Sequence, residues 1–138
     1  MAASNSIKEL NDLAMQESRR RYPNLPDYAR SPAKYKENTT NDLTKAIIHY
    51  ITFKGGYAVR INTQGQWNET LKQWTKSMTR KGTADIHACY QGRHYSIEIK
   101  VGNDRMSTDQ IVTEHDVQKA GGIYICARSL ESVTNIIK

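Results

Sequence analysis

The sequence predicts an α/β fold in which a mixed β-sheet is flanked by helices, and three observations support it. Segments with helical and with β-rich patterns alternate in the order α-β-β-β-α-β-α along residues 37–138. The chain of 138 residues is long enough to form one domain with a hydrophobic core of its own. Its 38% of hydrophobic and 25% of charged residues are typical of a globular protein.

Several classes of protein are excluded by the composition. No apolar segment approaches the ~20 residues that a membrane-spanning helix requires, and residues 1–10 lack the apolar region of a secretory signal. The two cysteines, Cys89 and Cys126, stand far apart, which favours buried thiols in a reducing compartment over a disulfide or a zinc finger. We therefore expect a cytoplasmic location and no membrane partner. The net charge of +6 favours a polyanionic partner.

The first 36 residues are predicted to form an arm outside the main domain. Residues 6–21 have the apolar spacing of a helix, and the three arginines at its end suit the negative pole of the helix dipole. Three prolines, at positions 23, 26 and 32, follow and disfavour regular structure there. We therefore divide the chain into an N-terminal helix with a proline-containing arm (residues 1–36) and a globular domain (residues 37–138).

The globular domain is expected to begin with a helix and a short strand. Polar residues at 39–42 can cap a helix whose apolar face lies within residues 43–51, and Gly55 ends it. Residues 57–61 then have the composition of a β-strand. These two elements supply the first helix and the first strand of the predicted order.

The segment from residue 62 to residue 82 shows no clear periodicity, and a loop this long within a compact domain is usually functional or disordered. Its only acid is Glu69. Its basic residues are Lys72, Lys76, Arg80 and Lys81, and it also contains Trp67 and Trp74. The basic residues are expected to contact phosphates, the alternative being a solvated charged loop. The tryptophans can stack on splayed bases or pack against the core, and packing is favoured for at least one of them.

The central element is a predicted β-hairpin formed by residues 83–90 and 93–101. If the two residues between these segments form the turn, Asp85 lies directly opposite Glu98. Lys100 lies two residues after Glu98 and therefore projects from the same face of the sheet. The other face carries mainly apolar and aromatic side chains, as expected for the side that packs against the core.

Two opposed carboxylates need a compensating positive charge. Directly opposite side chains have Cβ atoms ~5 Å apart, so the repulsion between two carboxylates is about 3 kcal/mol. The charge can come from the ammonium of Lys100 or from a divalent cation, and carboxylate oxygens suit Mg²⁺ or Mn²⁺. The alternative is a surface hairpin in which the two acids meet by accident. Zinc held by His87, Cys89 and His94 on the same face is disfavoured because no fourth ligand is near.

The last three elements are a helix, a strand and a short helix. Ser107 and Gln110 have the spacing of a capping box, so the helix is expected to begin at Ser107 and to continue to about Lys119. Residues 123–127 form a buried strand, and residues 130–137 a final helix. The capping box by itself can explain Gln110.

The order of these short motifs resembles that of a known nuclease family. Gly82-Thr-Ala-Asp85 is followed, across the hairpin, by Glu98-Ile-Lys100, and Ser107-Thr-Asp-Gln110 begins the next helix. This order is similar to that of the virus-type replication-repair nuclease (VRR-NUC) group of the PD-(D/E)XK nuclease superfamily. The apolar run after Gly121 also resembles the closing strand of that group. Alanine replaces the proline that usually precedes the first aspartate.

The resemblance covers about residues 37–138 and implies a fold and a set of functional residues. The implied fold is a restriction-endonuclease-like α-β-β-β-α-β core, to which the N-terminal helical arm is added. The implied cofactor is Mg²⁺ or Mn²⁺. The implied catalytic residues are Asp85, Glu98, Lys100 and Gln110. The implied metal ligands are Asp85, Glu98, the carbonyl of Ile99 and an acid of the first helix, which is Asp42 or alternatively Glu37.

The function implied by the resemblance is metal-dependent endonuclease activity on the phosphodiester bonds of DNA. Relatives of this kind select branched, junction or flap DNA, act as homodimers and serve replication, repair or recombination of a phage, virus or prophage, in a bacterial or phage-infected host cell. Two other classes stay open. A non-catalytic nucleic-acid-binding module is favoured by the lack of a clear glutamate in the first helix, and a basic protein adaptor would show no salt-dependent affinity for nucleic acid.

Overall fold

A four-stranded mixed sheet organises the protein, whose residues 2–138 are described by a computed structural model. Its strands are β1 (Tyr57–Arg60), β4 (Ile86–Tyr90), β5 (Arg93–Ile99) and β6 (Ile123–Ala127). They lie in the order β1-β4-β5-β6, in which β6 is parallel to β5 and the other pairs are antiparallel. The predicted fold class, a mixed sheet combined with helices, is therefore confirmed.

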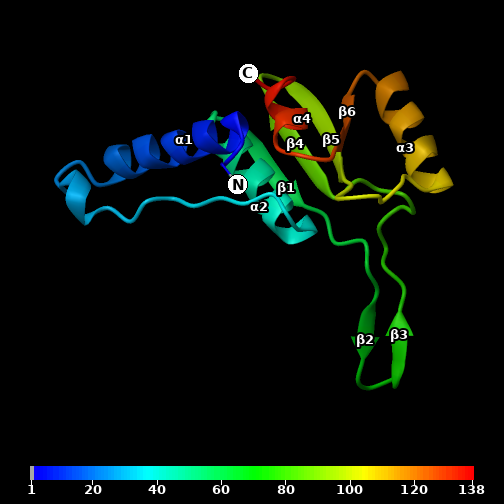
Figure 1. The fold of residues 1–138 in the computed structure, drawn as a ribbon. Coiled ribbons are helices and arrows are strands. Elements are labelled where there is room, and N and C mark those ends of the chain that lie inside the picture. Colours follow the sequence, from blue (N-terminus) through cyan, green and yellow to red (C-terminus); the bar gives the residue numbers. More distant parts are fainter. Residues whose placement is uncertain (1) are drawn as a thin grey trace.

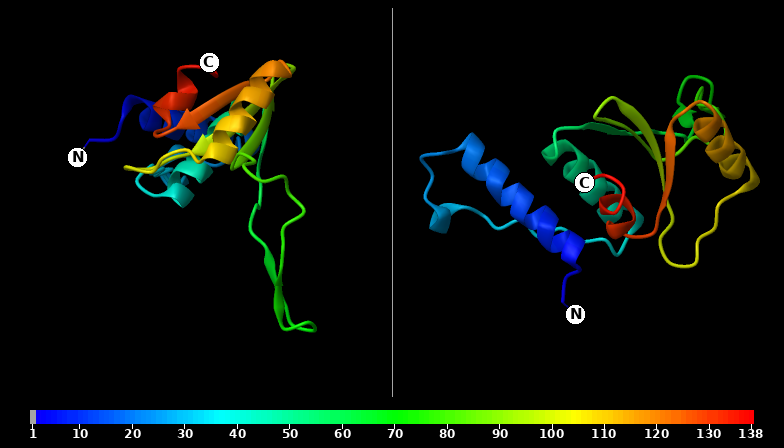
Figure 2. Two further views of the ribbon diagram at one scale, coloured as in Figure 1. Left: turned by 90° about the vertical axis from the view of Figure 1, so that its right-hand side faces the viewer. Right: turned by 90° about the horizontal axis from the view of Figure 1, so that it is seen from above.

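Helices cover both faces of this sheet (Figures 1 and 2). They are α1 (Asn5–Arg21), α2 (Thr40–Phe53), α3 (Thr108–Lys119) and α4 (Glu131–Thr134), with one 3₁₀ turn, η1 (Asp27–Ala29). α2 packs on one face with α1 and α4 beside it, and α3 lies against β6 on the other face. No helix within residues 2–138 combines the length and the apolar character needed to cross a membrane.

The first half of α1 belongs to the core. Ile7 and Leu10 are buried in the same cluster as the apolar face of α2 and the sheet. The hydroxyls of Ser6 and Thr134 lie 3.0 Å apart and connect α1 to α4. The segment that follows α1 contains only the turn η1, as its prolines predict, and the buried guanidinium of Arg30 donates to main-chain carbonyls there. The predicted arm therefore begins with residues that pack into the globular domain.

The central hairpin has the predicted register. In the pairing of β4 with β5, His87 lies opposite Ser96 and Tyr90 lies opposite Arg93. Gln91 has a φ of 50° and the following glycine also has a positive φ, the combination that a type I′ turn needs. β4 begins at Ile86, three residues later than predicted, so Asp85 lies just before the strand. The last helix is likewise shorter than the predicted 130–137.

The part of the hairpin's polar face that carries Ser96, Glu98 and Lys100 is covered, whereas the alternation of polar and apolar residues predicts an exposed face. Ser96, Glu98 and Lys100 are all buried because α3 packs over this side of the sheet. Cys89, in contrast, is exposed because it lies near the turn. The prediction of a buried thiol is therefore wrong for Cys89.

The aromatic hairpin, residues 66–75, is the second difference from the sequence expectation. Its strands, β2 (Gln66–Asn68) and β3 (Gln73–Thr75), pair only with each other and project away from the body of the protein (Figure 1). Trp67 lies opposite Trp74, and their ring centroids are 6.2 Å apart. The side chains are 49% and 70% exposed, so the expectation that one of them packs into the core is wrong.

Candidate functional site

Asp85 lies where β1, β4 and β5 meet. Its main-chain carbonyl accepts a hydrogen bond of 2.8 Å from the N–H of Ile61, directly after β1. Its side-chain Oδ2 accepts one of 2.9 Å from the N–H of Ile99, at the end of β5. Asp85 is therefore fixed from two sides, and its carboxylate lies beside the last residues of β5.

Glu98 is the most buried acid of the site, with 3% of its surface exposed. Its Oε1 accepts a hydrogen bond of 2.8 Å from Nε2 of Gln110 and lies 3.5 Å from Nζ of Lys100. Its Oε2 is buried and has no hydrogen-bond partner among residues 2–138. One oxygen of this carboxylate is thus fully engaged, and the other is left unpaired inside the protein.

The charge balance of the site is incomplete. Burial and, to a smaller extent, the negative charge of Asp85 raise the pKa of Glu98, and the opposing effect of Lys100 leaves it at about 7. The Lys100 ammonium also lies 3.7 Å from Asp104, so its positive charge is shared between two acids. A buried carboxylate with an unpaired oxygen and an elevated pKa is a position where a cation would be stabilising.

Gln110 carries out both roles that the sequence left open. Its Oε1 accepts a hydrogen bond of 2.8 Å from the main-chain N–H of Ser107. The main-chain N–H of Gln110 donates in turn to the Ser107 hydroxyl, which completes the capping box of α3. Its Nε2 donates to Glu98. The same side chain therefore begins the helix and orients the buried acid.

Tyr124 is a residue that the sequence reasoning missed. It lies on β6 opposite Ser96, on the same face as Glu98, and its buried hydroxyl has no hydrogen-bond partner among residues 2–138. Burial raises the pKa of Tyr124, and the charge of Glu98 raises it further. In the sequence Tyr124 belongs to an apolar run typical of a core strand, and only the parallel pairing of β6 with β5 places it at the site.

The two candidate acids of the first helix lie elsewhere. Asp42 stands in the first turn of α2, where its N–H donates to the hydroxyl of Thr39. Glu37 accepts hydrogen bonds from the Ser4 hydroxyl (3.0 Å) and from the N–H of Leu130 (2.8 Å), so it connects the N-terminal segment to α4. Within residues 2–138, no three His, Cys, Asp or Glu side chains gather as a metal-binding group. Among residues 2–138, the candidate site therefore has two carboxylates and no third acid.

The alternative zinc ligands, His87, Cys89 and His94, do not gather as a metal-binding group in the described part of the chain either. The two histidine rings contact each other edge to face, with centroids 5.3 Å apart. Nε2 of His94 is bonded instead to the hydroxyl of Ser96, at 2.7 Å. These side chains thus contact one another or their neighbours without forming a metal-binding group.

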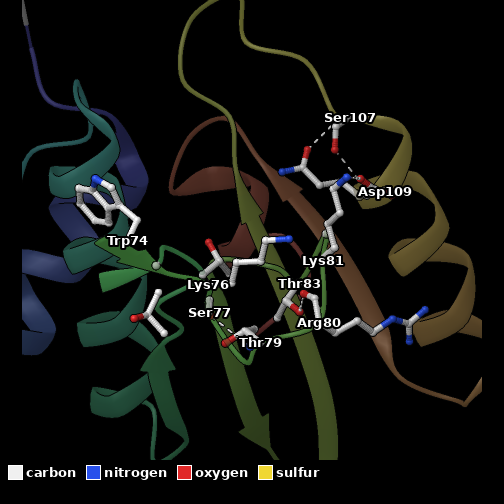
Figure 3. A pocket seen from close by; sticks show the side chains of 14 residues that line it. Trp74, Lys76, Ser77, Thr79, Arg80, Lys81, Thr83, Ser107 and Asp109 are labelled. Atoms are coloured by element: carbon white, nitrogen blue, oxygen red, sulfur yellow. Dashed lines mark hydrogen bonds and ion pairs between the residues drawn. The ribbon is translucent and has the colours of Figure 1, made fainter. Parts of the chain in front are cut away.

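An open groove of about 870 Å³ separates the aromatic hairpin from α3 (Figure 3). Trp74 lies at one end, and Ser107, Asp109 and Gln110 lie at the other. Gly82 forms part of its floor with a φ of 81°, and a Cβ there would overlap the main-chain carbonyl of Asp109. Glycine is therefore required at this position, where the chain passes directly beneath the start of α3.

The predicted nucleic-acid-binding residues line this groove or lie on the aromatic hairpin. Lys72 pairs with Glu69 near the tip of the hairpin, at 3.0 Å. Arg80 pairs with Asp116, and Lys81 lies 3.3 Å from Asp109, both acids of α3. Lys76 is exposed and has no acidic partner within ion-pair distance in the part of the chain that the structure describes.

Comparison with known proteins adds no relative. No protein-family model matches the chain, and no curated protein matches it significantly.

Proposed function

We propose that this chain is a Mg²⁺- or Mn²⁺-dependent endonuclease that hydrolyses DNA phosphodiester bonds, with a catalytic centre of the PD-(D/E)XK type. The observation that carries this proposal is the buried carboxylate of Glu98, whose Oε2 is unpaired beside Asp85 and Lys100. An unpaired buried polar atom costs about 1–3 kcal/mol or more, so it commonly indicates a ligand that pairs with it. Two carboxylates and a buried lysine fit a hard divalent cation and a phosphate.

Asp85 and Glu98 would hold the cation, and the resemblance adds the carbonyl of Ile99 as a further ligand. When bound, the ion would act as a Lewis acid toward a phosphoryl oxygen and lower the pKa of a water molecule. Gln110 and Lys100 engage Oε1 of Glu98, which leaves Oε2 for the ion. The role of Gln110 is therefore to position the ligand.

Lys100 would act on the phosphate and on the attacking water. Its ammonium is buried and lies between the carboxylates of Glu98 (3.5 Å) and Asp104 (3.7 Å), which restrict its position. A fixed positive charge stabilises the negative charge that develops on phosphoryl oxygens, and it needs no reorganisation during the reaction. An N–H of the same ammonium can hold the water in place for attack.

The finer features of the proposal depend on the VRR-NUC resemblance. It supports selectivity for branched, junction or flap DNA, assembly as a homodimer, and a role in phage, viral or prophage replication, repair or recombination. The order of helices and strands along residues 37–138 is consistent with a nuclease core of this kind. Sedimentation of the free protein, and of its complex with a four-way junction, would test the assembly.

A nuclease assay with conservative variants tests the catalytic centre. Wild-type protein should cleave supercoiled, linear, flap or junction DNA in the presence of Mg²⁺ or Mn²⁺, and chelation should stop the reaction. Asp85→Asn and Glu98→Gln keep the shape of each side chain but remove a charge, so each should reduce cleavage at least about a hundredfold. Glu131→Gln on α4 is the matched control and should cleave normally. Undiminished metal-dependent cleavage by Asp85→Asn would refute the proposal.

A non-catalytic nucleic-acid-binding module is the second candidate, and one observation favours it. Among residues 2–138, no third acid joins Asp85 and Glu98. Calorimetric titration of the protein with Mn²⁺ distinguishes the two candidates. An active centre should bind the ion, and Glu98→Gln should abolish this binding, whereas the non-catalytic module should show no binding that depends on the carboxylates.

A further inference from the structure

The aromatic hairpin is an exposed feature that lies outside the candidate catalytic centre. It pairs with no strand of the main sheet, and it projects from the body in Figure 1 and in the left view of Figure 2. An isolated two-stranded hairpin is marginally stable in water, and an edge-to-face aromatic pair contributes only about 0.5–1.5 kcal/mol. The Trp67–Trp74 pair thus helps to order the hairpin while leaving much of both indoles in water.

The Trp67–Trp74 pair has the properties of a stacking surface. Contiguous exposed apolar surface commonly marks a binding site, and the two exposed indoles contact each other. Nε1 of Trp67 donates to Glu69 at 3.1 Å, which fixes the edge of this indole and leaves its ring available for contacts. A flat π-face that is already ordered can stack on any nucleobase, at a gain of about 1–3 kcal/mol per base.

Positive charge lies between this aromatic pair and the catalytic centre. Lys72 is neutralised by Glu69 near the tip, but Lys76 at the base of β3 has no acidic partner in residues 2–138. Figure 3 shows Lys76 between Trp74 and Lys81 along the groove. This arrangement suits a polyanion that carries aromatic groups, which is the chemistry of a nucleic acid strand. A second copy of the same basic surface would be repelled.

The groove leads from the stacking surface to the centre. It is lined by Trp74 and Lys76 on one side and by Gln110 on the other, and Gln110 donates to Glu98. Asp85 lines an adjoining hollow, and Thr63 belongs to the walls of both. A strand lying in the groove would therefore pass beside Gln110, the hydrogen-bond partner of Glu98, and beside the hollow that Asp85 lines.

We propose that the Trp67–Trp74 pair stacks on unpaired bases of a nucleic acid strand, whose backbone follows the groove past Lys76 toward Asp85 and Glu98. The second part of this statement rests on the proposed function, whereas stacking on the hairpin does not. The substrate class that follows is DNA with a single-stranded segment next to the scissile bond, as at a flap or an open junction. Fully paired duplex offers no free base faces to the tryptophans.

Tryptophan fluorescence tests the stacking directly, because Trp67 and Trp74 are the two tryptophans of the chain. The titration uses metal-free Asp85→Asn protein with a single-stranded oligonucleotide and, separately, with its blunt duplex. The single strand should quench the emission and bind at least about tenfold more tightly than the duplex. Trp74→Ala should weaken single-strand binding about tenfold, and Trp74→Phe should restore most of it.

Two matched controls separate stacking from general effects. Tyr28→Ala removes an aromatic side chain that is 93% exposed but lies in the turn η1 and does not line the groove, so it should leave binding unchanged. Lys76→Gln should weaken binding to single strand and duplex alike and reduce the slope of log affinity against log salt by ~1. Circular dichroism of each variant should show an unchanged transition for the body of the protein.

The outcomes separate this proposal from the nuclease proposal. Unchanged single-strand affinity in Trp67→Ala/Trp74→Ala, or binding without quenching in Asp85→Asn, would overturn stacking whether or not the wild type cleaves DNA. Loss of self-association in the double variant, with DNA binding intact, would instead make the hairpin an interface between copies of the chain. Quenching by the single strand in a chain that never cleaves DNA would refute the nuclease and leave stacking supported.

Discussion

The two β-hairpins of the molecule differ in how much of each is buried. The β4–β5 hairpin lies in the middle of the sheet, with α2 on one face and α3 on the other, and side chains on both of its faces are buried. The β2–β3 hairpin stands alone, and most of its side chains are exposed. Packing of one face against an apolar core imposes a two-residue alternation on a sequence, and a hairpin surrounded by water is free of that constraint. One hairpin is therefore visible in the sequence, and the other is not.

The largest difference between the hairpins should be in the loss of stability when an apolar side chain is shortened to alanine. Ile97 on β5 is 0% exposed, so Ile97→Ala should lower the free energy of unfolding by about 3 kcal/mol, through lost burial and a cavity. Leu71 at the tip of the aromatic hairpin is 60% exposed, and Leu71→Ala should change it by less than about 0.5 kcal/mol. Urea unfolding measures both. Equal losses in the free energy of unfolding would mean that the aromatic hairpin is packed against another surface in solution.

The pH dependence of stability should separate the buried acid from exposed ones. Because the pKa of Glu98 is raised from 4.5 to about 7, the folded metal-free protein binds more protons than the unfolded chain between these values. The free energy of unfolding should therefore fall as pH rises through this window, by at most about 1.4 kcal/mol per pH unit from this group. Glu98→Gln should flatten that part of the profile. An identical slope in the variant would place the titration elsewhere.

The two members of the α3 capping box should contribute equally to stability but differently to Mn²⁺ binding. Ser107→Ala and Gln110→Ala should each lower the free energy of unfolding by about 1 kcal/mol, because each removes a cap contact. Only Gln110→Ala also removes the hydrogen bond to Glu98, so it should weaken Mn²⁺ binding about tenfold further. Calorimetry gives the affinity. Equal Mn²⁺ affinities in the two variants would reduce Gln110 to a helix cap.

Two buried tyrosine hydroxyls should give the smallest effects, with opposite signs. Tyr124→Phe removes a hydroxyl that has no partner among residues 2–138 and should stabilise the metal-free protein by up to about 1 kcal/mol. Tyr50→Phe removes a hydrogen bond of 2.8 Å to the carbonyl of Ile137 and should destabilise it by about 1 kcal/mol. Thermal unfolding compares the pair. Destabilisation by Tyr124→Phe would show that its hydroxyl is paired in solution, for example with a buried water.

Local patterns in the sequence were sufficient for the elements that carry their own signals. The turn between β4 and β5 fixes the pairing register, and the capping box fixes the first residue of α3. The register predicted that Asp85 and Glu98 would lie together, and the motif resemblance implied that Gln110 would join them; the hydrogen bonds of Asp85 to Ile99 and of Gln110 to Glu98 agree. These contacts depend on sequence separations of about a dozen residues, which a turn and a cap can specify.

Features that depend on distant segments could not be predicted in this way. Glu98 and Lys100 alternate with apolar residues, which indicates a solvent-facing side, and only the docking of α3 buries them. Ile7 and Leu10, the two residues of α1 in the core cluster, are too few for the sequence alone to predict that this helix packs there. Tyr124 reaches the site through a parallel pairing whose partner strand lies across a whole helix. In each case a long-range contact, with no local pattern of its own, decided the outcome.

The double role of Gln110 links occupancy of the groove to the chemistry of the centre. Its amide borders the groove, begins α3 and fixes one oxygen of Glu98. A ligand that displaces this amide also breaks its hydrogen bond to Glu98. An ion that moves the Glu98 carboxylate likewise disturbs the amide and, through it, the capping box of α3. A groove ligand that displaces Gln110 would therefore be thermodynamically coupled to an ion at the acids through this one side chain, and each would change the affinity of the other by the same factor.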